Sequence, residues 1–357
     1  MNTFGTRYRT LIFGTSHGPF VGCTIEGLRA GTRVDAAYVQ AQLDRRRPGQ
    51  SLVTSQRKEA DRVEFAEGLA DDGATGEPIV AILRNEDVQS QSYVDVGRIP
   101  RPGHGDFTAQ VKYGGRSDLR GGGQLSGRMT APLVVSGAVA RQVLLPRGIR
   151  FYAHAAQIGT VTSRPVTVAE IEANVERTPV RCADLEAADR MVAEVEAARM
   201  GRDSVGGIIE AWITGLPVGV GEPFFDSVEA SLAHLLFSIP AVKGVDFGAG
   251  FRAASMRGSE HNDPFAVADG RVVTETNHAG GILGGITDGM PVTFRVVVKP
   301  TASIARPQRS VDLEAMKPAE TVVTGRHDPC IVPRAVPVVE NAAAMSVLDL
   351  MLQGGFV

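Results

Sequence analysis

The chain has 357 residues, of which 43% are hydrophobic and 22% are charged, and its formal net charge is −3 at pH 7. This composition is typical of a soluble globular protein and gives no reason to expect nucleic acid or a membrane surface as a partner. No apolar run reaches the ~20 residues of a membrane helix, and the N-terminus lacks a signal-peptide core. Cys23, Cys182 and Cys330 are far apart, which predicts a reducing cytoplasm, no disulfide framework and no metal site of the zinc type.

The first predicted elements are two helices with a strand between them. Residues 34–49 are predicted to form a helix, with Asp35 as its N-cap and Pro48 as its end. The β-branched run at 78–83 predicts a strand. Residues 125–145 are apolar on nearly every side, which predicts a buried helix.

The next two elements are again a helix and a strand. Residues 183–201 predict an amphipathic helix with Leu185, Val192 and Val195 on one face. The run at 206–214 is rich in β-branched residues and predicts a strand.

The last part of the chain adds two helices and a strand. Residues 225–240 predict a helix that begins with a capping-box-like Asp226. Residues 292–300 predict a strand and residues 341–355 a final helix. The mixture indicates an α+β fold, and because no linker or strong repeat interrupts it, we expect a single domain over residues 1–357.

Glycine is unusually frequent, with 41 of 357 residues, well above the usual share of ~7%. The glycines cluster at 120–127, 244–251 and 277–289, between apolar segments. Such clusters predict loops in which the backbone turns tightly or lies against a ligand.

Three histidines, His17, His104 and His327, each have a glycine within two positions. One such histidine is more often bonded to a backbone carbonyl than catalytic. Three in similar settings favour proton transfer near neutral pH. Zinc binding is disfavoured, because no histidine has a partner four residues away and no cysteine pair is available.

The serine that precedes His17 raises the alternative of a serine nucleophile. Neighbouring residues on an extended strand point to opposite faces, so Ser16 and His17 are not expected to be partners. The surrounding residues also do not form a G-x-S-x-G elbow, which disfavours a serine hydrolase.

Arginines stand beside glycines at 45–49, 101–105, 116–128 and 325–327. A solvated basic surface is the simpler interpretation of such runs, but a surface does not need glycines. A multiply anionic ligand needs both guanidinium forks and closely approaching backbone N–H groups. The stretch RGGGQLSGR fits this best, although it is neither a Walker loop nor a G-x-G-x-x-G motif. The residues therefore predict an enzyme for a small anionic ligand.

Seven unusual blocks follow one another along the chain: FGTSHG, RRRPGQ, RPGHGDF, DLRGGGQLSGR, PAVKGVDFGAGF, NHAGGILGGI and GRHDPCIVPRAVPVVE. This series, part of a similarity that runs from about residue 4 to residue 350, resembles the chorismate synthase family. The resemblance implies a β-α-β sandwich, in which a central helical layer lies between β-sheets, and a homotetramer in the cytoplasm.

The resemblance also implies a reaction. In it, 5-enolpyruvylshikimate 3-phosphate loses phosphate and a hydrogen in a 1,4-elimination that gives chorismate. Reduced FMN is needed although there is no net redox change, and some members use NADPH as the electron source. His17 would lie beside the flavin, and His104 would protonate the departing phosphate. Asp328 with Ser16 would manage the proton at flavin N5.

Matching positions imply two sets of binding residues. Those implied for FMN are Gln124, Leu125, Ser126, Pro240, Ala241, Gly284, Lys299, Pro300, Thr301, Ala302, Ser303 and Arg326. Those implied for the anionic substrate are Arg46, Arg120 and Arg128.

The chain departs from the usual family pattern at Thr15, Leu52, Gly105, Gln124 and Met129. Thr15 and Met129 each stand where a carboxylate is usual, and Gln124 stands where arginine is usual. These departures keep open a divergent FMN-dependent lyase for a related phosphorylated cyclic acid. A non-catalytic RNA- or anion-binding protein is a further alternative, which the net charge and the spread of the motifs disfavour.

Overall fold

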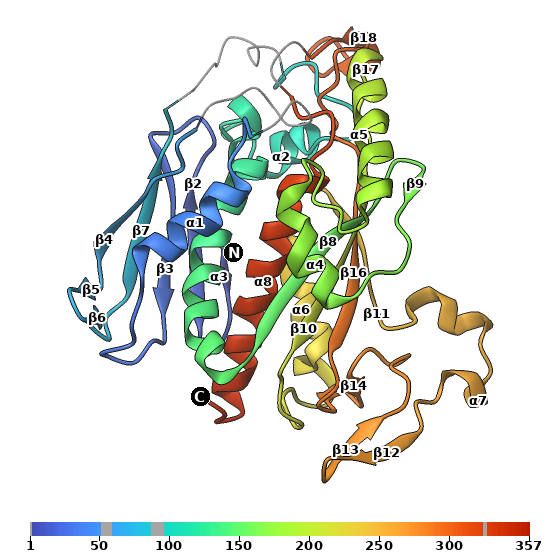
Figure 1. Ribbon diagram of the computed structural model, residues 1–357. Coiled ribbons are helices and arrows are strands. Elements are labelled where there is room, and N and C mark those ends of the chain that lie inside the picture. The colour runs from blue at the N-terminus through green and yellow to red at the C-terminus, as the bar shows by residue number, and fades with distance from the viewer. Residues whose placement is uncertain (1, 51–58, 87–95, 324–326) are drawn as a thin grey trace.

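The computed structural model describes residues 2–50, 59–86, 96–323 and 327–357, and within these ranges two five-stranded antiparallel sheets face each other (Figure 1). The first sheet, in spatial order, consists of β1 (Thr3–Phe4), β2 (Arg9–Gly14), β3 (Phe20–Glu26), β7 (Ile79–Arg84) and β4 (Val63–Glu67). The second consists of β11 (Val242–Phe247), β16 (Val292–Val298), β10 (Gly207–Thr214), β8 (Arg150–Ile158) and β9 (Val161–Thr162). The strands predicted at 78–83, 206–214 and 292–300 are confirmed as β7, β10 and β16.

A layer of helices lies between the two sheets, as Figure 1 shows. It is formed by α1 (Ala36–Arg46), α3 (Thr130–Leu144), α6 (Val228–Ser238) and α8 (Val332–Gln353). Helix α3 packs on β2, β3 and β7, α8 packs on β8 and β10, and the two helices pack along each other. This arrangement confirms the predicted α+β fold with a central helical layer.

The remaining elements lie around this sandwich. They are α2 (Asp106–Lys112), α4 (Val168–Asn174), α5 (Leu185–Met200), α7 (Gly258–His261) and the strand pairs β5–β6 (Leu69–Ala70, Gly73–Ala74), β12–β13 (Phe265–Ala268, Arg271–Thr274), β14–β15 (Ile282–Leu283, Ile286–Thr287) and β17–β18 (Gln308–Asp312, Lys317–Thr321). Short 3-10 helices cover Arg120–Leu125, Gly127–Met129, Leu145–Arg147, Val175–Arg177, Phe224–Asp226 and Gly250–Ser255. The segment with α7, β12 and β13 forms an arm that projects from the sandwich (Figure 1).

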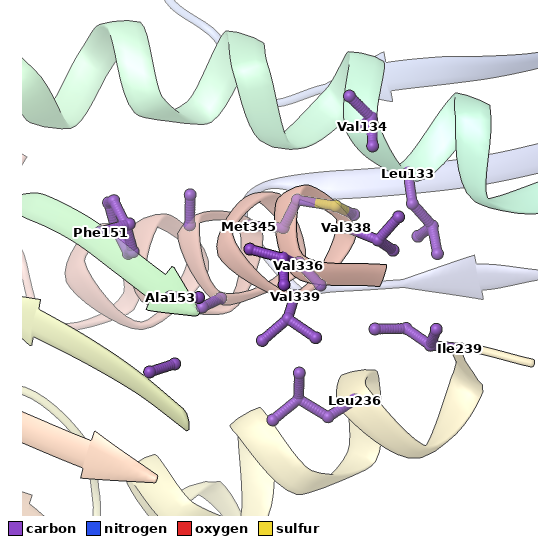
Figure 2. Close-up of a cluster of buried hydrophobic side chains, with 14 of the residues drawn as sticks. Leu133, Val134, Phe151, Ala153, Leu236, Ile239, Val336, Val338, Val339 and Met345 are labelled. Atoms are coloured by element: carbon purple, nitrogen blue, oxygen red, sulfur yellow. The ribbon is translucent and has the colours of Figure 1, made fainter. Parts of the chain in front are cut away.

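The core surrounds α8, which is buried along almost its whole length. Figure 2 shows side chains of α8 packed against side chains from α3, β8 and the end of α6. They are Val336, Val338, Val339 and Met345 of α8, Leu133 and Val134 of α3, Phe151 and Ala153 of β8, and Leu236 and Ile239 from the α6 end. By length and composition, Gly127–Arg147 and α8 could each cross a membrane, which the sequence interpretation did not anticipate. However, 78% and 94% of their apolar windows are buried inside the protein, so they serve as core helices.

The close crossing of α3 and α8 depends on Gly137. A Cβ at this position would lie 2.2 Å from the backbone oxygen of Asn341 and 2.4 Å from its Cβ. Since backbone cannot yield as a flexible side chain does, Gly137→Ala should lower the free energy of unfolding by about 1–3 kcal/mol. Urea unfolding measures this, and an unchanged midpoint would show that the helices can separate at little cost.

The last helix begins earlier than predicted. The sequence interpretation started it at residue 341, whereas α8 starts at Val332 and contains Pro337. A proline inside a helix leaves the carbonyl four residues earlier without its N–H donor. Here Arg181 Nη1 donates to that carbonyl, the oxygen of Pro333, at 2.8 Å. A side chain distant in sequence thus compensates for the proline.

Two local helix predictions were also wrong. Helix α6 is capped by Ser227, whose Oγ accepts from Ala230 N at 3.1 Å, and not by Asp226, which lies in the preceding 3-10 turn. In α5, Leu185 is exposed because it is the first residue of the helix, while Met191 and Val195 form part of the buried face. The cap predicted for α1 is confirmed, since Asp35 accepts from Ala37 N at 2.8 Å.

Candidate active site

A cavity of about 540 Å³ opens where α1 and α6 end and α8 begins, near the upper end of α8 in Figure 1. Loops from distant parts of the chain complete its walls. Of the residues predicted from the sequence, the walls contain His17, Arg46, His104, Gln124, Leu125, Ser126, Arg128, Pro240, Ala241, Lys299, Pro300, Thr301, Ala302, Ser303 and Asp328. The chain therefore brings most of the predicted site residues to one cavity.

A turn of three glycines brings two histidines together. Gly121, Gly122 and Gly123 have φ angles of 59°, 86° and 54°, in the left-handed region that favours glycine. A Cβ on Gly121 would lie 2.4 Å from Nε2 of His17, and a Cβ on Gly122 would lie 3.3 Å from Nε2 of His104. The missing side chains thus make room for both imidazole rings.

The relation between Ser16 and His17 differs from the prediction. The two residues lie in the turn between β2 and β3, not on an extended strand, so the opposite-face argument does not apply. Both side chains reach Gly121, because its Cβ would also lie 3.0 Å from Ser16 Oγ. Ser16 is fully buried behind the turn and does not belong to the cavity wall.

Gly121→Ala should disturb this turn strongly. The new Cβ would displace the His17 ring, and we expect kcat/KM to fall by about 10²-fold, as for other misplacements of ~1 Å. Gly114→Ala is the matched control, because Gly114 has a nearly identical φ of 57° but no atom within 4 Å of the added Cβ. Equal losses of activity in both variants would show that backbone strain, and not the contact with His17, is responsible.

Two arginines on the cavity wall share one buried carboxylate. Asp61 accepts from Arg46 Nη1 at 2.7 Å and, through its other oxygen, from Arg128 Nη1. Arg46 Nε also donates to Thr130 Oγ1 at 3.1 Å, and Arg128 Nε donates to Asn85 Oδ1 at 2.9 Å. Both guanidinium groups are thereby fixed at the edge of the cavity.

The electrostatics of this cluster favour an added anion. Burial lowers the pKa of Arg46 to about 9. The positive charges of Arg334 and Arg128 also lower this pKa, whereas the negative charge of Asp61 raises it. Although burial alone would raise the pKa of Asp61, Arg46 and Arg128 lower it. Asp61 is therefore shared by two buried guanidinium groups, Arg334 pairs with Asp328 at 2.5 Å, and the buried Glu59 adds a further carboxylate to the cavity wall.

A third group of polar side chains surrounds His104. Its Nδ1 lies 2.7 Å from Asp106 Oδ1, and Arg101 binds the same carboxylate. His327 lines the cavity as well. Burial lowers the pKa of His327 to about 4, and Arg101 and His104 act in the same direction, so His327 is neutral at neutral pH.

The loop after β16 is tied to two other walls of the cavity. Lys299 Nζ donates to the Gly103 oxygen at 2.7 Å, and Lys299 N donates to the Ala241 oxygen at 2.9 Å. Ala241 has a φ of 74°, which is unusual for a residue with a side chain. Burial, with Lys243 nearby, lowers the pKa of Lys299.

Two predicted binding residues, Gly284 and Arg120, are not brought to the cavity. Gly284 lies in the turn of β14–β15, beside Ser227 at the start of α6. The cavity lies at the other end of this helix. The two ends are about 16 Å apart, because the helix has 11 residues and rises 1.5 Å per residue. Arg120 is half exposed because its guanidinium is held by Asp118 at 2.9 Å, two residues earlier. Arg326 and the departure Leu52 lie outside the described residues.

Sequence reasoning also missed several residues of the site. Arg101, Asp106 and Arg334 were part of quoted motifs but had no assigned role, and Asp61 was not singled out. A carboxylate two residues after a predicted functional histidine is a signal that could have found Asp106, since a buried charge needs a partner. Asp61 has no such signal, because it lies 15 residues after Arg46 in the sequence.

Of the arginine run at 45–47, only Arg47 is exposed, whereas RNA binding would need an exposed basic surface. Arg45 pairs with Glu340 at 2.6 Å and with Glu176 at 2.7 Å. Arg46 is buried on Asp61. These ion pairs count against the RNA-binding alternative.

The fold and the cavity together indicate an enzyme of the α+β sandwich class with a cavity lined by arginines and histidines. Comparisons with known proteins agree. A family described as "Chorismate synthase" matches residues 8–352. The chain belongs to the chorismate synthase family.

Relatives and a solved structure resemble the chain over nearly its full length. A chorismate synthase of Methanocella arvoryzae is 53% identical, covering 100% of this chain and 95% of the relative. One of Korarchaeum cryptofilum is 49% identical, covering 98% and 97%. A crystal structure of chorismate synthase has a TM-score of 0.77 at 24% identity, covering 98% and 93%, and so supports the fold.

Proposed function

We propose that the cavity binds 5-enolpyruvylshikimate 3-phosphate beside reduced FMN and promotes the 1,4-elimination of phosphate to give chorismate. The chain is a lyase of the shikimate pathway, which leads to the aromatic amino acids, by its family. The observation that carries the residue assignment is that one cavity holds the Arg46–Asp61–Arg128 cluster together with His17 and His104.

The arginine cluster would hold the phosphate and carboxylate groups of the substrate. A guanidinium has five N–H donors. Within the described residues, three donors of Arg46 have protein partners, namely Asp61, Thr130 and the Gly127 oxygen. The others can bind an anion at the cavity edge without loss of the support from Asp61.

Other residues of the cavity wall have the chemistry to hold a flavin. Lys299 supplies positive charge for the FMN phosphate, and the glycine turn offers backbone in place of side chains. Gln124–Ser126, Pro240–Ala241 and Lys299–Ser303 would hold the cofactor. When bound, reduced FMN supplies electron density that assists cleavage of the C–O bond and accepts the substrate hydrogen.

His104 would act on the leaving group. As the C3–O bond breaks, His104 Nε2 would give its proton to the departing phosphate oxygen. His17 would lie beside the flavin, where it would help to hold the reduced form. Asp328 and Ser16 would handle the proton at flavin N5, although the structure places Ser16 behind the glycine turn.

Phosphate release under anaerobic conditions tests this proposal. The purified protein should release phosphate from 5-enolpyruvylshikimate 3-phosphate and form chorismate only when reduced FMN is present. No turnover with reduced FMN bound would contradict the proposed reaction.

A divergent lyase of the same family is a second candidate. Gln124 and Met129, two of the departures, line one side cavity of about 230 Å³ that shares Gln124, Ser238 and Pro240 with the main one. A changed wall can change which ring the site accepts. This candidate predicts flavin binding without turnover of the shikimate-pathway substrate, but with turnover of a related phosphorylated cyclic acid.

We also propose a homotetramer in the cytoplasm, with NADPH as a possible electron source. Cys23, Cys182 and Cys330 are free and buried, which a reducing compartment permits. Phe225 and Phe251 are highly exposed and could be covered by subunit contacts. Light scattering that gives a monomer mass would contradict the tetramer, and absence of flavin-dependent NADPH oxidation would contradict the electron source.

A further inference from the structure

We propose that Asp106 is a positioning residue, which holds the His104 ring by its Nδ1–H so that Nε2 is presented to the cavity. This inference rests on the proposed general-acid role of His104 and deepens it. Asp106 is fully buried behind the cavity wall, whereas His104 belongs to the wall. Asp106 therefore acts through His104 and not on the ligand.

The contact between the two residues is short and direct. His104 Nδ1 lies 2.7 Å from Asp106 Oδ1, a distance typical of a strong hydrogen bond. The other face of the ring system lies at the glycine turn, where a Cβ on Gly122 would be 3.3 Å from Nε2. Arg101 Nη2 lies 3.3 Å from Nε2 as well as near Nδ1, but of the two ring nitrogens only Nδ1 faces the buried Asp106 carboxylate.

Arg101 keeps Asp106 in its ionised form. Arg101 Nε donates to Oδ2 at 2.7 Å and Nη2 donates to Oδ1 at 2.7 Å, which is a bidentate fork. The backbone N of Arg101 adds a third donor at 3.1 Å. Burial alone would raise the pKa of Asp106, but the hydrogen bonds from Arg101 and His104 lower it well below its usual value.

An ionised carboxylate can only accept hydrogen bonds, and this fixes the tautomer of His104. With Asp106 as acceptor, the proton must be on Nδ1. Arg101 Nη2 also lies 3.0 Å from His104 Nδ1, but a protonated Nδ1 has no lone pair to accept from it. Arg101 and Asp106 contact His104 directly, and His327 interacts with it electrostatically. Lys299, which binds the Gly103 oxygen, and His17, beside the same glycine turn, are further titratable groups nearby.

The tautomer has a direct consequence for the reaction. When His104 acts as the acid, Asp106 accepts from its Nδ1–H. When Nε2 gives its proton to the departing phosphate oxygen, the Nδ1–H stays bound to Asp106 and the ring becomes neutral. No other proton has to move for His104 to complete this step.

The same guanidinium also reaches the proposed cofactor loop. Arg101 Nη1 donates to Ser303 Oγ at 2.9 Å, and both groups are buried. The support of His104 and the position of the 299–303 loop are therefore linked through Arg101, as expected when a proton donor must be aligned with a bound cofactor.

Histidine labelling tests the tautomer without any assay of activity. In the 13C,15N-histidine-labelled full-length protein above pH 8, the His104 signal, assigned by its loss in His104→Gln, should show Nδ1 protonated and Nε2 unprotonated. A wild-type ring protonated at Nε2 would overturn the proposal, whatever the variants do.

Asp106→Asn then tests the consequence. The amide keeps the shape but not the charge, so we expect a mixed tautomer and a fall in kcat of about 10- to 10³-fold, with KM nearly unchanged. Asp106→Glu should retain the Nδ1 proton and recover part of kcat. Should Asp106→Asn fail to fold, kcat of Asp106→Glu and the tautomer of His104 in the wild-type protein still test whether Asp106 positions the ring.

A matched control is available outside the cavity. Asp246 accepts a similar fork from Arg295, at 3.0 and 2.6 Å, and Asp246→Asn should change neither the His104 tautomer nor kcat. An unchanged tautomer and a kcat within about twofold of wild type in Asp106→Asn would overturn the proposal. If His104→Ala is fully active, the general-acid role fails, and the tautomer result still reports on Asp106.

Discussion

Replacing His104 with alanine should lower kcat for phosphate release by about 10²- to 10⁴-fold, the usual contribution of general acid catalysis. His104 lines the cavity, and its Nε2 lies beside the Gly122 turn. Without a proton donor, phosphate must leave with its full negative charge. Because Arg46 and Arg128 would still bind the anionic groups, KM should change much less than kcat. Single-turnover phosphate release with reduced FMN separates these effects.

His17→Ala is the matched control for this variant, because His17 is the other imidazole against the glycine turn. We expect it to weaken binding of reduced FMN more than binding of oxidised FMN, with a smaller effect on the phosphate-release step. A near wild-type single-turnover rate in His104→Ala would remove His104 as the acid. A large loss confined to His17→Ala would then assign the proton to His17.

The elements of the sandwich could be predicted where their signals are local. Asp35 caps α1, and most of the apolar 125–145 segment forms the buried α3, although this helix begins only at Thr130, after two 3-10 turns. The early start of α8 could not be predicted, because the donor that compensates for Pro337 is Arg181, which only the folded chain brings there. Local propensity marks the proline as a break, and tertiary structure overrides it.

The site shows the same division. The histidines and arginines beside glycine could be predicted as site residues from their residue types, and most of them lie at one cavity. Asp61 and Asp106 were not predicted, since an aspartate in a sequence is usually exposed and only the fold reveals that both are buried against arginines. The positions of Gly284 and Arg120 could not be predicted from their motifs. A motif does not show that its loop packs at the start of α6, as for Gly284, or that its arginine pairs with a neighbouring aspartate, as for Arg120.

Asp61→Ala should lower the free energy of unfolding by about 3–5 kcal/mol, the usual cost of removing one partner of a buried ion pair. Arg46 and Arg128 would both stay buried without a carboxylate. Because these arginines lower the pKa of Asp61, its contribution is complete at neutral pH and is lost only as the pH falls through the native-state pKa. Urea unfolding at pH 7 measures the loss, and a change below 1 kcal/mol would contradict the assigned role.

Glu64→Ala is the control, since Glu64 accepts a comparable fork from Arg84, at 2.8 and 3.0 Å, at the surface. An exposed pair contributes only about 0–1 kcal/mol, so the difference between the two variants isolates burial. Phosphate should stabilise Asp61→Ala more than wild type, because a bound anion takes the place of the missing carboxylate between the two guanidinium groups. Stabilisation of neither protein by phosphate would contradict the assignment of this cluster to the substrate anion.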